Sequence, residues 1–146
     1  SIEINALSKF KFLKIFEDLA LKDEAFFQKE IWINTSEAEI FPALNPSYEI
    51  SKSLIGKLVS FKKNLMDINT KKKLKIKKII LGPFKSELNP IGIMDPEFVA
   101  KKIYKLSNSE SYLLIISPNP LTYLIFPLTE FLNLLYCKII HNYLSR

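Results

Sequence analysis

The sequence predicts a single α/β domain over residues 1–146, in which a small, mostly parallel sheet carries helices on its faces. Strand-like apolar runs alternate with helical patterns three times along the chain. This alternation is typical of parallel strands joined by right-handed crossovers. Three of the helical patterns also begin at an Asn-Pro or Asp-Pro pair, where a capping side chain precedes a proline that suits the first helical turn.

Four helices are expected in chain order. The first runs from about Lys9 to Leu21, with Ser8 as its cap. The second follows Asn45 and keeps a helical spacing of apolar residues to about residue 69. The third follows Asp95 and the fourth follows Asn119.

Three strands are expected, over residues Glu30–Thr35, Leu74–Leu81 and Ser111–Ser117. The last is apolar at five successive positions, which predicts a strand covered on both faces in the middle of the sheet. Trp32 is expected in the core for the same reason. Residues Glu87–Met94 can instead form an antiparallel strand, and an α+β fold of ferredoxin-like or profilin-like type is therefore the alternative.

The fourth helix lies in the most apolar stretch of the chain, residues Leu121–Ile140. Polar or helix-bending residues interrupt it at Pro127, Glu130, Asn133 and Lys138. Each polar group is costly in hydrocarbon, so the composition disfavours a membrane helix. Because apolar residues occur on nearly every side, we expect this helix to be buried on more than one side or to face a protein partner.

The composition is poor in the residue types that most enzymes use. The chain has one arginine, one histidine, one cysteine and three glycines. Its +6 charge rests on lysine, which lacks the planar fork with which arginine reads DNA bases. No glycine-rich phosphate loop or cluster of metal ligands is found. The sequence therefore predicts no catalytic residues, no metal and no cofactor.

Cys137 and His141 are four residues apart on the expected last helix and so share a face. A nucleophile pair or a metal site needs a further partner, and none lies nearby in the sequence. We expect both to be packing residues. The single cysteine also favours the cytoplasm or another reducing compartment.

The function predicted from these observations is non-catalytic: an intracellular adaptor, a subunit of a complex or an assembly factor that works through protein–protein contacts. Its partner is another protein or a second copy of the chain. The expected contact surface comprises the loop after the second strand and the last helix, through Phe84, Ile91, Ile93, Met94, Phe131, Leu135 and Tyr143.

The alternative function is that of a nucleic-acid-associated accessory protein. A strip of lysines would contact the phosphate backbone; it comprises Lys62, Lys63, Lys71, Lys72, Lys73, Lys75, Lys77 and Lys78. The simpler interpretation of the same lysines is an edge strand whose charges prevent pairing with other chains.

Overall fold

The computed structural model describes residues 2–24, 27–87 and 89–144 of the chain. Its element order is a π-helical turn η1 (Glu3–Leu7), α1 (Ser8–Lys22), β1 (Lys29–Ser36), a 3-10 turn η2 (Glu37–Glu39), α2 (Pro46–Leu65), α3 (Ile68–Lys73), β2 (Leu74–Leu81), α4 (Pro96–Ser107), β3 (Leu113–Ile116) and α5 (Thr122–Leu144). The three strands form a parallel sheet in the order β1-β2-β3. The predicted α/β fold is confirmed.

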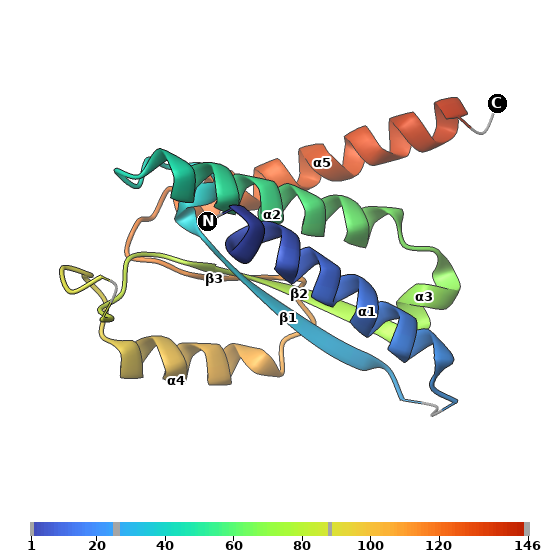
Figure 1. The fold of residues 1–146 in the computed structure, drawn as a ribbon, viewed down its shortest axis with the longest axis horizontal. Helices are drawn as coiled ribbons and strands as arrows, with labels where there is room; N and C mark the ends of the chain where they lie inside the picture. The colour runs from blue at the N-terminus through green and yellow to red at the C-terminus, as the bar shows by residue number, and fades with distance from the viewer. Residues whose placement is uncertain (1, 25–26, 88, 145–146) are drawn as a thin grey trace.

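Helices cover both faces of this sheet (Figure 1). One core lies between the sheet and helices α1 and α2, and its buried residues include Leu13, Ile33, Ile55 and Ile76. A smaller core on the opposite face joins α4 to the sheet through Val99 and its neighbours. Both faces of the sheet are therefore covered by helices and contribute core residues, as expected for a parallel sheet.

The order of the strands corrects two predictions. The lysine-rich strand β2 lies in the centre, whereas β3 lies at an edge. β3 is apolar because α4 and α5 contact it, not because strands flank it on both sides. Trp32 on β1 is 37% exposed and is not a core residue.

The two crossovers have opposite hands. Both step in the same direction across the sheet, from β1 to β2 and from β2 to β3, yet α2 and α4 lie on opposite faces. One crossover is therefore left-handed, which is rare, and the expectation of two right-handed crossovers is wrong. With α1 and α2 on one face, α4 covers the other.

Asn45-Pro46 and Asp95-Pro96 start helices as predicted, whereas α5 begins only at Thr122, two residues after Pro120. Asn45 Oδ1 accepts a hydrogen bond from Tyr48 N at 3.1 Å, and Asp95 Oδ1 accepts one from Glu97 N at 2.9 Å. Ser8 is not a cap, because it already has helical backbone angles and follows η1 directly. The second predicted helix ends at Leu65, after which Asp67 caps the short α3.

Candidate functional site

A buried charged cluster lies between the sheet, α2 and α5. Lys78 of β2 is 2% exposed, and its Nζ lies 2.8 Å from Glu39 Oε2 and 2.8 Å from Glu130 Oε1. The same ammonium donates to Ser60 Oγ and to the backbone oxygen of Gly56, both at 3.2 Å. We call Lys78, Glu39, Glu130 and Ser60 the charged cluster. It joins residues from four separate elements.

Local structure on β1 and α2 places Glu39 in this cluster. Ser36 Oγ accepts from Ala38 N and starts η2 directly after β1, which turns the chain back over α2. Ser53 Oγ then donates to the Glu39 carbonyl at 2.6 Å. Gly56 leaves the space for the carboxylate, since a Cβ there would lie 1.8 Å from Glu39 Oε2.

Burial shifts the pKa values of two groups at this cluster, Glu39 and the neighbouring Tyr112. It raises the pKa of Glu39, an effect that the nearby Lys78 ammonium only partly offsets. Glu39 Oε1 is buried without a hydrogen-bond partner in the described part of the chain. Burial also raises the pKa of Tyr112, whose hydroxyl lies 3.5 Å from Ser60 Oγ. Carboxyl, ammonium and phenol groups in contact can hold and exchange protons.

A second set of hydrogen-bonded polar side chains lies at the carboxyl ends of the strands, where ligands of α/β proteins commonly bind. Glu37 accepts hydrogen bonds from the hydroxyls of Ser117 and Thr122. Asn119 follows β3 and accepts from Leu121 N at 3.0 Å. Because a carboxylate occupies this edge, it does not favour a phosphate or another anion.

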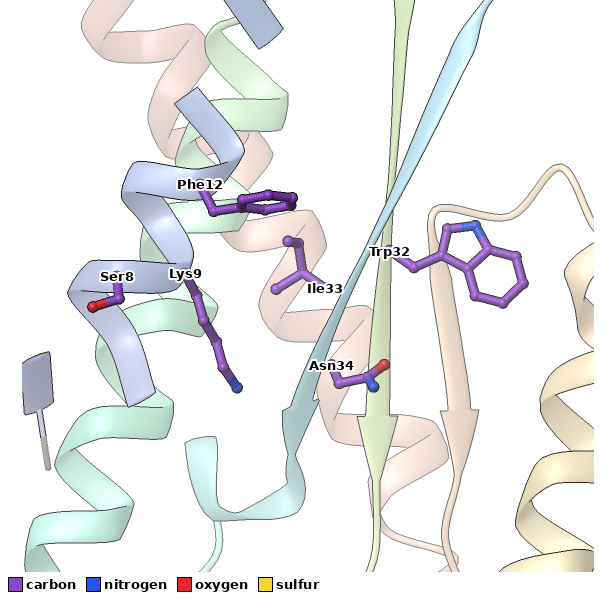
Figure 2. A pocket seen from close by; sticks show the side chains of 6 residues that line it. All are labelled: Ser8, Lys9, Phe12, Trp32, Ile33 and Asn34. Atoms are coloured by element: carbon purple, nitrogen blue, oxygen red, sulfur yellow. The ribbon is translucent and has the colours of Figure 1, made fainter. Parts of the chain in front are cut away.

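Two hollows flank β1. The smaller, of about 380 Å³, lies along the free edge of the strand beside α1. In Figure 2, Lys9 and Phe12 of α1 approach this hollow from one side of the strand, while Trp32 projects from the other. The larger hollow, of about 610 Å³, separates β1 from α4. Its lining consists of Glu30, Trp32, Ala100, Ile103, Tyr104, Ser107 and Asn108.

An ion pair with Lys77 keeps Glu30, which lines the larger hollow, in its ionised form. Lys77 Nζ lies 3.0 Å from Glu30 Oε1 and 5.3 Å from the centre of the Trp32 ring. Burial alone would raise the pKa of Glu30, but hydrogen bonds from Trp32 and Lys77 outweigh it and hold that pKa below its ordinary value. Glu30 therefore stays ionised near neutral pH, and the hollow offers two aromatic side chains, Trp32 and Tyr104, and a carboxylate acceptor.

The structure separates the residues predicted to contact a partner. Ile91, Ile93, Phe131, Leu135 and Tyr143 are exposed, and Phe84 is partly buried. Met94 is only 7% exposed and belongs to the core beneath α4, so it cannot form part of a contact surface.

The structure also divides the predicted lysine strip. Lys77 and Lys78 are 1% and 2% exposed and point to opposite faces of the central strand. Both are held by carboxylates, and neither can reach a phosphate backbone. Lys71, Lys72 and Lys73 belong to α3, and Lys62 and Lys63 end α2. Lys75 pairs with Glu110 at 2.6 Å.

One comparison with known proteins identifies a relative. The chain is 40% identical over 136 residues to monoglucosyldiacylglycerol epimerase from Synechocystis sp.. The match covers 93% of this chain and 32% of that relative, so the chain spans about a third of the length of the protein it matches. No family model and no solved structure matches the chain.

This relative overturns the predicted class of function. It is an enzyme, so the prediction of a non-catalytic adaptor, subunit or assembly factor is wrong. The nucleic-acid alternative stays a prediction, although Lys77 and Lys78 are buried and cannot take part in it. Scarcity of arginine, histidine and cysteine was a poor guide, because carboxylates, lysine and tyrosine also exchange protons.

The sequence reasoning missed Glu39 and Glu130 as members of one site. A signal was present for Glu130: it is the single charged residue between Leu121 and Cys137, and a charge in an apolar helix needs a buried partner. No such signal marks Glu39, because only the fold brings η2 over α2.

Proposed function

We propose that this chain is part of an enzyme that inverts one stereocentre in the sugar of a glycosylated diacylglycerol. The supporting observation is the 40% identity over 136 residues to monoglucosyldiacylglycerol epimerase. That identity extends over 93% of the chain, so the similarity is not confined to one motif. Because the relative is about three times as long, we expect other parts of such an enzyme to share its active site.

Inversion of a stereocentre breaks a bond at one carbon and re-forms it on the opposite face. Groups that can take up and return a proton assist such a step. On this chain, Glu39 and Tyr112 are the groups whose protonated forms burial favours. Neither lines the two hollows beside β1, so we assign the charged cluster a positioning role in this enzyme: it holds β2, α2 and α5 in fixed register.

The test is to delete the gene in its native cell and to analyse the glycolipids. We expect monoglucosyldiacylglycerol to accumulate and a diacylglycerol lipid with an epimeric sugar to decline. Re-expression of the native polypeptide should reverse both changes. In parallel, the protein purified from that cell should convert monoglucosyldiacylglycerol labelled in its glucose into a lipid that releases a different labelled hexose on hydrolysis.

An unchanged glycolipid profile after deletion, together with recovery of labelled glucose alone from the purified protein, would overturn the proposal. A catalytically silent control is available in Ile91→Ser, which alters an exposed loop residue remote from the charged cluster. This variant should restore the profile as fully as the unaltered protein does.

A further inference from the structure

The helix α5 presents its apolar side chains outward. It is long and apolar enough to cross a membrane by length and composition, yet only 11% of its most apolar window is buried. This corrects the expectation that it is buried on more than one side. Its exposed large hydrophobic residues are Tyr123, Leu124, Leu128, Phe131, Leu132, Leu135, Tyr136, Ile139 and Tyr143.

From Thr122 to Asn133 the polar side chains of α5 point the other way, toward the protein, whereas Lys138, His141 and Asn142 near its C-terminal end are exposed. Thr122 is fully buried and donates to Glu37. Glu130 accepts from Lys78 and from Ser60. Asn133 lies on the same side, one turn further on, and is partly buried. In a helix that faces water the arrangement is the reverse, with polar residues outward.

This inverted polarity points to an apolar surrounding for the outward face. From Leu121 to Cys137 the helix carries one charge, Glu130, and the fold neutralises it internally. A lipid tail can satisfy no hydrogen-bonding group, so a lipid-facing helix must hide such groups against its own protein. The outward face of α5 meets this requirement.

The packing of α5 fixes its orientation. The helix lies along α2, where the ring of Tyr136, which is still 55% exposed, stacks on the ring of Phe61 at 5.9 Å. α2 also carries Lys57, Lys62 and Lys63, and charged side chains are costly in hydrocarbon. If α5 crossed a bilayer, these lysines would enter the hydrocarbon with it. A helix with one apolar face can instead lie in the membrane plane.

We propose that the outward face of α5 docks on the surface of a lipid bilayer, with the helix axis parallel to the membrane. The choice of lipid rather than protein rests on the proposed function, because a glycosylated diacylglycerol resides in membranes. The +6 charge of the chain adds attraction to anionic lipids. Figure 1 shows the C-terminal part of α5 extending beyond the rest of the molecule, where a flat surface can reach it.

The test is flotation of the purified protein with vesicles that contain no glycolipid. One set is phosphatidylcholine, and a second is an equal mixture of phosphatidylcholine and phosphatidylglycerol. We expect the protein to float with both sets and more strongly with the anionic one. The variant Leu128→Asp/Leu132→Asp, altered at two exposed positions on the outward face, should lose binding by about tenfold or more, because aspartate enters apolar lipid poorly.

The matched control is Ile91→Asp/Ile93→Asp, which places the same charges at two exposed residues of the loop before α4. It should bind as the unaltered protein does, and circular dichroism should show all three proteins folded. No flotation with either vesicle set would overturn the proposal. So would equal loss of binding in both variants, or a dimer in solution that only the Leu128/Leu132 variant abolishes, since that face would then contact a second copy.

The flotation assay is independent of the epimerase assay. Vesicle binding with an unchanged glycolipid profile after gene deletion would refute the proposed function and leave the lipid-binding surface in place. A changed glycolipid profile without vesicle binding would refute the surface and leave the function in place.

Discussion

The helix α4 joins β2 to β3, and α5 follows β3. The two helices differ in which side chains they turn toward the protein. In α4 Val99, Ile103 and Leu106 face the core, while Lys101 and Lys102 are exposed. In α5 Thr122, Phe126 and Glu130 face the core, whereas Phe131 and four leucines, Leu124, Leu128, Leu132 and Leu135, face outward. Helical periodicity therefore reveals that a helix has two faces, but the surroundings decide which of them faces the protein.

The two helices are also held by different forces. α4 is held by apolar packing and by its Asp95 cap. α5 is held by Phe126, by Cys137 and by the ion pair between Glu130 and Lys78. Removing one apolar contact costs only part of the packing energy of a helix. Removing one partner of a buried ion pair leaves the other charge buried without a counter-charge, which is strongly destabilising. Substitutions should therefore affect the two helices very differently.

Lys78→Met should have the largest effect and should act on α5. It leaves Glu39 and Glu130 buried without their shared counter-charge, which costs about 3–5 kcal/mol of unfolding free energy. Urea denaturation measures the loss. Hydrogen exchange should show faster exchange in α5 and little change in α4.

Lys101→Met is the control for this experiment, because Lys101 pairs with Glu97 only on the exposed surface. Its effect should stay within about 0.5 kcal/mol. A Lys78→Met protein as stable as this control would show that the charged cluster does not hold α5.

Gly56→Ala should have the second largest effect. Alanine usually stabilises a helix relative to glycine, by roughly 0.5–1 kcal/mol. Here the new Cβ would meet the Glu39 carboxylate and push it away from Lys78, so we expect a net loss of about 1–3 kcal/mol, typical of overpacking.

The same substitution in a Glu39→Ala background should restore the ordinary gain, since the obstructing carboxylate is gone. Thermal denaturation of the four proteins completes the double-mutant cycle. Stabilisation by Gly56→Ala in both backgrounds would mean that Glu39 does not cross α2 at this point.

Asp95→Ala should cost about 1 kcal/mol, the usual loss at a helix start. Asp95 Oδ1 accepts from Glu97 N and from Phe98 N, at 2.9 and 3.2 Å. Only α4 should loosen, in contrast to the Lys78 variant. Glu87→Ala removes an exposed carboxylate from the preceding loop and should be nearly neutral. Equal stability of the two variants would indicate that α4 starts without its cap.

Local rules predicted α4 and the strands well. Asp95-Pro96 starts α4, and the strand Leu74–Leu81 has the predicted bounds, because caps and apolar runs act through neighbours in the sequence. The order of strands depends on contacts far apart in the chain. An alternation of lysine with apolar residues in β2 fits an exposed edge equally well. In the structure β2 pairs with both other strands, and Glu30, Glu39 and Glu130 neutralise its buried lysines Lys77 and Lys78.

The site was harder to predict than the fold for the same reason. The three main members of the charged cluster come from residues 39, 78 and 130, and no local spacing connects them. The charge of Glu130 within an apolar helix was visible, and it was interpreted as an argument against a membrane. In the structure the charge is hidden against the protein and much of the outward face is apolar, which supports the lipid-binding surface proposed above.

Glu39→Gln should change the free energy of unfolding least, and the pH dependence of that change reports whether Glu39 is protonated in the folded protein. Burial raises the pKa of Glu39, so the folded protein binds its proton more tightly than the unfolded chain does. Above the ordinary value of 4.5, the unfolded chain releases this proton first, and stability falls as pH rises toward the folded pKa. Glutamine does not titrate and lacks this loss.

The stability of Glu39→Gln relative to the unaltered protein should therefore increase from pH 4 to pH 8, as measured by urea denaturation at several pH values. A relative stability of Glu39→Gln that falls with rising pH would mean that Lys78 dominates burial at Glu39, so that the cluster stabilises the ionised carboxylate.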